Sequence, residues 1–205
     1  AIHLIDPFPI PSSWRRLRVI DFGYTNPFVC QWWAQDGDGR LYRYRELYMT
    51  GRTVRAHAAQ INALTGGEQI EATIADHDAE DRATLAENGI FTTAADKAIT
   101  VGIQAVSERL AVAGDGRARL FLMRDALVEI DESLEERKLP TCTEEEIEGY
   151  AWPKAADGKP IREQPVKEND HGSDALRYLV MYVDRSGGAA MTTQAPLPLA
   201  DYTGI

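Results

Sequence analysis

Three segments near the start of the chain have the hydrophobic pattern of β-strands. An apolar run at 17–21 is followed by a longer one at 28–34, and residues 40–49 alternate Leu and Tyr with Arg. The sequence Asp-Gly-Asp-Gly at 36–39 is a typical hairpin turn between the second and third segments. Because such short connections join neighbouring antiparallel strands, these segments predict a three-stranded antiparallel meander.

From residue 53 onward, predicted strands alternate with predicted helices. A helix is predicted at 53–64, where Thr53 is a suitable N-cap and Gly66 and Gly67 form a stop signal. Further strands are expected at 70–76, 90–95, 117–123 and 149–154, and further helices at 80–89, 97–112, 125–138, 143–148 and 169–185, with a loop at 154–165. This order predicts an α/β fold: a mixed sheet, partly antiparallel and partly parallel, with helices on both faces.

The two ends of the chain lack this pattern. Residues 1–16 are rich in Pro and are expected to form a linker or arm, and residues 186–205 are rich in Gly, Ala, Thr and Pro and are expected to form a C-terminal tail. The intervening region, 17–185, is long enough for one domain with a sizeable core. The chain begins with Ala rather than Met, which favours a piece of a longer protein.

Charge is the compositional feature that constrains function most. The 205 residues carry a formal net charge of -10, which argues against a general nucleic-acid coat protein. Ten acidic and three basic residues lie at 123–148, so most of the excess belongs to one segment. A solvated helical face is the simplest interpretation of such a run.

The remaining composition is that of an ordinary globular domain. No apolar run approaches the ~18 residues of a membrane span, and the N-terminal residues lack the basic and apolar regions of a secretory signal. Cys30 and Cys142 are far apart in the sequence, and neither has a partner at metal-ligand spacing. We therefore expect two free thiols in a reducing cytoplasm.

Carboxylates follow two of the predicted strands. Asp21 and Asp76 each stand at the C-terminal end of a strand, so they meet at one sheet edge if the two strands are neighbours. In the last helix, Asp170 and Asp174 share one face, and His171 can reach the same side. Any one of these acids alone is more often a turn cap or an ion-pair partner, but the set indicates a shared site.

A site built from carboxylates has a definite chemistry. Like charges that lie close together repel each other and need a cation. Hard oxygen ligands suit Mg²⁺ or Mn²⁺ rather than zinc. Two such ions about 4 Å apart support hydrolysis of a phosphodiester, so this is the reaction class that the acids indicate.

The order of these acids along the chain resembles that of the RNase H-like nucleases. The segments IDFGYTNPF, IADHDAEDRATLAENGI, DKAITVGIQAVSERL and KENDHGSDALRYL are similar to the nuclease domain of the large terminase subunit of tailed bacteriophages. The resemblance runs from about 17 to 184, and its last segment is the most specific. It implies an RNase H-like fold and a metal-dependent endonuclease that cuts concatemeric double-stranded DNA during viral DNA packaging.

The resemblance also implies roles for individual residues. Asp21, Asp76 and Asp174 are expected to be catalytic and to bind two Mg²⁺ or Mn²⁺ ions. The second acid of the family could align with Asp78 instead of Asp76. We prefer Asp76 because it directly follows the apolar residues of its strand, which leaves Asp78 as an outer ligand or as the cap of the next helix.

Further residues and partners follow from the same resemblance. Asp170 and His171 are expected beside the ligands, and Lys97 is expected to contact a DNA phosphate. Large terminase subunits also carry an N-terminal packaging ATPase, whose G-x-x-x-x-G-K-[ST] loop is absent from this sequence. The missing ATPase domain is therefore an expected partner, together with double-stranded DNA, the small terminase subunit and the portal, in the cytoplasm of the infected bacterial host.

Other functions remain open on the sequence alone. IDFGYTN also resembles the first phosphate loop of actin-like and Hsp70-like ATPases, although the second phosphate loop and the Gly-Gly adenosine site of those proteins are not evident. A resolvase or transposase of RNase H type would carry the same acids. The domain could also be a non-enzymatic docking module that binds a partner through its acidic segment at 123–148.

Overall fold

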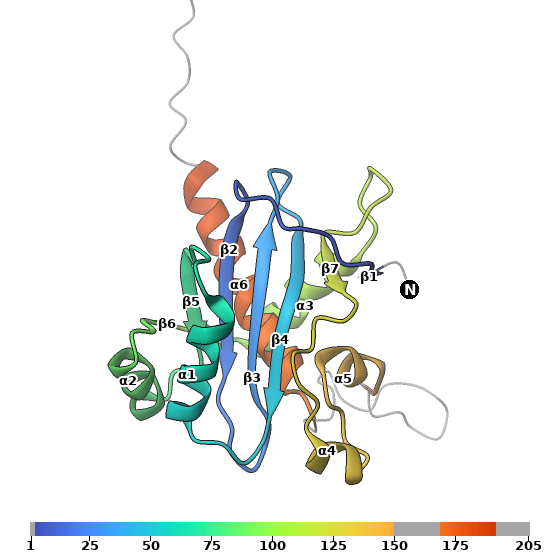
Figure 1. Ribbon diagram of the computed structural model, residues 1–205. Coiled ribbons are helices and arrows are strands. Elements are labelled where there is room, and N and C mark those ends of the chain that lie inside the picture. Colours follow the sequence, from blue (N-terminus) through green and yellow to red (C-terminus); the bar gives the residue numbers. More distant parts are fainter. Residues whose placement is uncertain (1–2, 150–168, 192–205) are drawn as a thin grey trace, which may run out of the picture.

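The computed structural model describes residues 3–149 and 169–191, which form one sheet covered by helices (Figure 1). The strands are β1 (Leu4–Ile5), β2 (Arg15–Asp21), β3 (Phe28–Gln35), β4 (Leu41–Met49), β5 (Ala72–Ala75), β6 (Thr93–Ala94) and β7 (Leu120–Met123). The helices are α1 (Val54–Thr65), α2 (Ala79–Glu87), α3 (Ile99–Leu110), α4 (Glu132–Glu136), α5 (Thr143–Gly149) and α6 (His171–Met191).

Three antiparallel strands form the centre of the sheet, whose full order is β1-β7-β4-β3-β2-β5-β6. In the meander of β2, β3 and β4, Ile20 lies opposite Cys30, and Cys30 lies opposite Leu47. β5 pairs in parallel with β2, and β7 pairs in parallel with β4. The structure therefore confirms the predicted mixed sheet.

Each face of the sheet buries its own hydrophobic cluster. On one face, Leu17 and Val19 of β2 pack with Leu179 of α6, and α3 packs against α6. On the opposite face, Ile20 packs with Ile61 of α1, and α2 packs against α1. In Figure 1, α6 and α3 lie behind the sheet and α1 lies in front of it, so helices cover both faces as predicted.

The boundaries of the central elements follow the sequence signals. Thr53 caps α1 by accepting a hydrogen bond from the amide of Ala56, and the helix ends at Gly66, which has a positive φ of 54°. The hairpin turn is closed by Asp36, whose carboxylate accepts a hydrogen bond from the amide of Arg40 at 2.8 Å. Local turn and cap chemistry therefore determines where these elements begin and end.

The segment at 125–138 is less helical than predicted. Asp125 has a φ of 58°, in the left-handed region, which interrupts any helix that includes it. Leu127 forms a bridge with Glu46, so the chain first follows the edge of β4. A helix, α4, begins only after Asp131, whose carboxylate caps it. Pairing with the sheet therefore overrides the helical preference of this segment.

Regular structure extends into both predicted flanking regions. Within the predicted arm, Leu4–Ile5 forms β1 and pairs in parallel with β7 at the sheet edge. At the other end, α6 continues past the predicted end at 185 to Met191. The strand and loop predicted between 149 and 165 fall outside the described residues, except that Gly149 belongs to α5. None of the helices in the described part is long and apolar enough to cross a lipid bilayer.

The acidic segment is not simply a solvated face. Asp131 and Glu146 are only 4% and 2% exposed. Asp131 accepts hydrogen bonds from the amide and the hydroxyl of Thr50, and Glu146 accepts one from the hydroxyl of Tyr48. The prediction of a solvated face is wrong for both acids, which are buried and bind residues far away in the sequence.

Both cysteines are free thiols, as expected. Burial raises the pKa of the Cys30 thiol to about 12. It therefore stays protonated and packs in the sheet as a small apolar side chain.

A buried ion pair connects β4 to α5. The Nη1 of Arg43 lies 2.8 Å from Oε2 of Glu46, both side chains are fully buried, and Arg43 also pairs with Glu144. Glu46 further accepts hydrogen bonds from the amide of Thr143 at 3.1 Å and from Nε2 of Gln31 at 3.0 Å. In such a buried network, loss of one charge leaves another without compensation.

Replacing Arg43 by Met should therefore lower the free energy of unfolding by about 3–5 kcal/mol. Arg55→Met is the matched control, because Arg55 pairs with Glu87 at the surface, where the two side chains are 69% and 65% exposed. Its loss should change stability by no more than about 1 kcal/mol. Urea denaturation compares the two variants, and similar midpoints would show that the buried pair does not matter.

A glycine allows α3 and α6 to approach each other closely. A Cβ atom at Gly102 would lie 2.5 Å from Cγ and 2.7 Å from Cδ of Arg177. Contacts this short are not tolerated in a packed interior. The aliphatic part of Arg177 therefore occupies space that only glycine leaves open.

Gly102→Ala should lower the free energy of unfolding by about 1–3 kcal/mol, although Ala has the higher helix propensity. Gly114→Ala is the control, because a Cβ atom at Gly114 meets nothing within 4 Å. It should change stability by less than about 0.5 kcal/mol. Thermal unfolding measures both effects, and stabilisation by Gly102→Ala would be incompatible with the close contact.

Candidate active site

Side-chain alternation along β2 and β5 directs two carboxylates to the same face of the sheet. Val19 faces α6, so Asp21, two residues later, faces α6 as well. In β5, Ile74 faces α6, and Asp76 follows it at the same spacing. The amide of Asp76 donates to the carbonyl oxygen of Ile20 at 3.1 Å, so the strands remain paired up to the two acids.

Helix α6 brings a third carboxylate to this edge. Asp174 lies in its first turn, and Tyr178, one turn later, is 1% exposed. Burial, followed by the charges of Asp21, Asp174 and Asp76, raises the pKa of the Tyr178 phenol. The charges of all three acids that the sequence singles out therefore disfavour ionisation of the same buried phenol.

Asp21 is the most buried of these acids, with 9% of its side chain exposed against 21% for Asp76 and 17% for Asp174. Burial raises the pKa of Asp21, a hydrogen bond from His171 opposes this, and the charges of Asp174 and Asp76 raise it further. The net upward direction is the one expected where like charges converge in a buried site.

His171 is the basic partner of Asp21. Its Nδ1 lies 3.2 Å from Oδ2 of Asp21. Burial opposes protonation of His171, but the hydrogen bond and charge of Asp21, with the charges of Glu146 and Asp170, raise its pKa above the ordinary value. The imidazole therefore holds its proton more tightly than a free histidine and partly compensates the charge of Asp21.

Asp76 has a lysine partner. The Nζ of Lys97 lies 2.7 Å from Oδ1 and 3.0 Å from Oδ2 of Asp76. Burial opposes ionisation of Asp76, but Lys97 and the amide of His77 hold its pKa below the ordinary value. The side chain of Lys97 is 39% exposed, so its ammonium group lies between a predicted metal ligand and the solvent.

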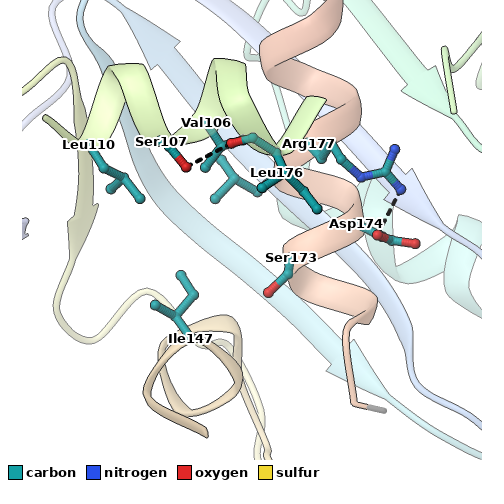
Figure 2. Close-up of a pocket in the computed structure, with 9 residues that line it drawn as sticks. Val106, Ser107, Leu110, Ile147, Ser173, Asp174, Leu176 and Arg177 are labelled. Atoms are coloured by element: carbon teal, nitrogen blue, oxygen red, sulfur yellow. Dashed lines mark hydrogen bonds and ion pairs between the residues drawn. The ribbon is translucent and has the colours of Figure 1, made fainter. Parts of the chain in front are cut away.

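Asp174 pairs with Arg177 one turn later in α6, with 2.7 Å between Oδ1 and Nη2 (Figure 2). The same two residues line a pocket of about 220 Å³ between α3, α5 and α6, with apolar side chains such as Val106 on its walls. Neither Asp21 nor Asp76 lines this pocket. It therefore lies next to the acidic edge and is not the same site.

Asp78 and Asp170 take part in the starts of helices. The carboxylate of Asp78 accepts hydrogen bonds from the amides of Glu80 and Asp81 at 3.0 Å each and so caps α2. The carbonyl oxygen of Asp170 accepts a hydrogen bond from the amide of Asp174 at 2.7 Å, at the start of α6. Helix capping is one of the two roles predicted for Asp78.

The donor chemistry of the acidic edge fits a hard divalent cation. Among residues 3–149 and 169–191, no three His, Cys, Asp or Glu side chains stand close enough to hold one metal ion. Each acid instead has a basic partner, in the pairs Asp21–His171, Asp76–Lys97 and Asp174–Arg177. The edge nevertheless offers carboxylate oxygens from three elements, no thiolate, and a repulsion that a cation would relieve.

Sequence reasoning missed two residues that contribute to this edge. Tyr178 looks like part of the packing face of α6, although its spacing of four residues from Asp174 is a signal that the two share a face. Glu146 hydrogen-bonds to the first turn of α6, but nothing local distinguishes it from its neighbour Glu145 in the acidic run.

Comparison with known proteins gives a consistent result. No family model matches the sequence, and no curated protein matches it significantly. The large terminase of the thermophilic bacteriophage D6E, solved in complex with ADP, superposes with a TM-score of 0.66 at 22% identity, over 87% of this chain and 42% of that chain. The P22 large terminase nuclease domain gives a TM-score of 0.62 at 18% identity, over 90% and 88%. The large terminase nuclease of the thermophilic phage G20c gives 0.53 at 17% identity, over 82% and 82%.

The extent of these matches identifies the part of a terminase that the chain resembles. It spans 42% of the D6E protein but covers most of the P22 and G20c nuclease domains. At these identities the likeness concerns the fold. These superpositions show that this chain has the fold of the large terminase nuclease domains of P22 and G20c.

Proposed function

We propose that this chain is the metal-dependent endonuclease domain of a viral DNA-packaging large terminase subunit, and that it cuts concatemeric double-stranded DNA. The observation that supports the proposal is the placement of the three acids: Asp21 and Asp76 follow each other across two paired strands, and Asp174 lies in the first turn of α6, which packs on those strands. The likeness in fold to terminase nuclease domains supports the same class of reaction.

The proposed metal ligands are Asp21, Asp76 and Asp174. Their oxygen donors suit two Mg²⁺ or Mn²⁺ ions. When bound, such ions supply activation of a water molecule and stabilisation of the leaving oxygen in phosphodiester hydrolysis. The mutual repulsion of the three carboxylates favours entry of cations into this part of the domain.

The basic residues of the edge orient the acids. His171, when its Nδ1 is protonated, donates to Asp21 at 3.2 Å. Arg177, whose aliphatic part occupies the gap left by Gly102, pairs with Asp174. Lys97 is the exposed member of the set. We assign it the contact with a DNA phosphate, to which its ammonium group transfers from Asp76 when the scissile strand binds.

The substrate is double-stranded DNA, although the chain has a net charge of -10. Lys97 is the one basic residue assigned to a phosphate here, so most phosphate contacts come from elsewhere in this proposal. Their proposed source is the packaging ATPase domain or another subunit. The small terminase subunit and the portal are the other proposed partners, in the cytoplasm of the infected bacterial host.

The phosphate-loop alternative is less favoured by the local geometry. The carboxylate of Asp21 contacts His171 of α6, which leaves it facing the helix. The following loop also turns back on itself, because a Cβ atom at Gly23 would lie 2.5 Å from the carbonyl oxygen of Asn26. A resolvase or transposase of the same fold is the stronger alternative. Such an enzyme would be distinguished by a preference for branched DNA or for a specific DNA sequence.

Asp21→Asn, Asp76→Asn and Asp174→Asn should each slow Mn²⁺-dependent cleavage of linear duplex DNA about 100-fold or more, because each removes a ligand charge without changing the size of the side chain. Initial rates in Mn²⁺ and in Mg²⁺ measure this, with circular dichroism as a check of folding. Wild-type rates in all three variants, or no cleavage by the wild type, would overturn the proposal.

Two further variants sharpen the assignment. Asp38→Asn is the control, since Asp38 lies in the hairpin turn with its side chain 68% exposed and should leave the rate unchanged. Asp78→Ala removes the α2 cap and should cost about 1 kcal/mol of stability with little effect on the rate. If Asp78→Ala abolishes cleavage and Asp76→Asn does not, Asp78 is the second ligand. A strong preference for four-way junctions over linear duplex would favour a resolvase.

A further inference from the structure

The first turn of α6 is held by a buried carboxylate from a different helix. The amides at the start of a helix have no intrahelical acceptor. Glu146 of α5 accepts the amide of Gly172 on Oε1 at 2.9 Å and the amide of Ser173 on Oε2 at 2.8 Å. Tyr48 of β4 donates its hydroxyl to the same carboxylate at 2.6 Å. Both oxygens of Glu146 are therefore engaged, and the residue is 2% exposed.

A second set of contacts fixes the same turn from the sheet. The Nε2 of Gln31 donates to the carbonyl oxygen of Gly172 at 3.0 Å and to the hydroxyl of Thr143 at 2.7 Å. Gly172 has no room for a side chain, because a Cβ atom there would lie 2.9 Å from Cβ of Thr143. The backbone of α6 thus lies directly against α5, which is possible only with glycine at this position.

Burying the carboxylate of Glu146 costs free energy that a neutral residue at the start of α6 would not cost. Burial raises the pKa of Glu146 to about 7, although the hydrogen bonds from Gly172, Tyr48 and Ser173 lower it. Nearby Glu46 adds repulsion. A buried acid of this kind is weak evidence for stability, because an apolar replacement of similar volume is often as stable. The specific consequence of Glu146 is therefore the fixed geometry of the first turn of α6, and not added stability.

The two residues next to this cap belong to the acidic edge. His171 precedes Gly172 and contacts Asp21, and Asp174 follows Ser173. Because an amide hydrogen bond fixes the peptide plane, bonds to successive amides fix the direction in which the flanking side chains leave the helix. The hydrogen bonds of the Gly172 and Ser173 amides to Glu146 therefore determine the directions in which the side chains of His171 and Asp174 point.

We propose that Glu146 is a positioning residue that fixes the first turn of α6 and thereby aims Asp174 and His171 at Asp21 and Asp76. This inference rests on the proposed function in one respect, since it assigns the effect to metal-dependent cleavage. The geometric part concerns the helix alone and is measured separately. Glu146 itself touches neither substrate nor metal in this account.

Amide hydrogen exchange tests the geometric part in the chain by itself. In Glu146→Ala, exchange at Gly172 and Ser173 should accelerate about tenfold or more, while Leu179 in the middle of α6 should keep its wild-type rate. Glu145→Ala is the matched control, because Glu145 is on the same helix but accepts hydrogen bonds from Thr141. Unchanged exchange at Gly172 and Ser173 in Glu146→Ala would overturn the proposal.

The functional part is tested by the Mn²⁺ dependence of cleavage. Glu146→Ala should need about tenfold more Mn²⁺ for half-maximal rate, and Glu146→Gln, which keeps one acceptor oxygen, should recover part of the loss. Glu145→Ala should follow the wild type. A lower maximal rate at unchanged Mn²⁺ dependence, with no recovery in Glu146→Gln, would show a merely structural role and sink the inference.

The two proposals fail in different ways. If the wild type does not cleave DNA, the proposed function fails, while amide exchange still reports on Glu146. If the wild type cleaves and Glu146→Ala matches it in Mn²⁺ dependence, the positioning role fails and the function stands. Should Glu146→Ala not fold, Tyr48→Phe removes one donor to Glu146, and a Mn²⁺ dependence equal to that of wild type in both Tyr48→Phe and Glu146→Gln would count against the inference.

Discussion

The electrostatics of three carboxylates, each paired with a basic side chain, is the constraint on which the candidate site depends. Asp21, Asp76 and Asp174 come from parts of the chain that are far apart in sequence, and folding brings their charges to one edge, where burial strengthens the interaction. Each acid is accompanied by a basic side chain that offsets part of its charge. Under the proposed function, a divalent cation would take over part of this compensation.

The geometry of this edge depends on how α6 is held. The helix lies across β2, β3 and β5, which carry or flank the other two acids. Gly102 lets α3 approach Arg177, and Gly172 lets α5 approach the first turn. Glycine at these two positions leaves room for the side chains of Arg177 and Thr143 between the helices. The positions of the acids are therefore set by backbone packing as much as by the acids themselves.

The sequence predicted the features that local periodicity determines. Asp21 and Asp76 follow apolar runs, so their place at the end of a strand could be inferred, and the alternation within β2 and β5 then sends both to one face. Parallel pairing of these strands was not visible in either segment. The sequence analysis could state it only as a condition, and the structure shows that β2 and β5 are parallel neighbours.

The features that the sequence did not predict depend on distant partners. Asp125 adopts a left-handed conformation and Leu127 pairs with Glu46, so the first part of the predicted helix is not formed. Glu146 reaches an amide 26 residues away in the chain, from within a run of acids that look alike. Non-local contacts of this kind leave no periodic signal in the sequence. The composition of the acidic segment at 123–148 therefore predicted a solvated face where the structure has buried acids.

A crystal of the domain soaked in Mn²⁺ tests the central claim most directly. The account predicts anomalous scattering between Asp21, Asp76 and Asp174, with Lys97 moved away from Asp76, and no such signal in crystals of Asp174→Asn. Anomalous peaks at another place in the domain, or none at Mn²⁺ concentrations that support DNA cleavage, would contradict it.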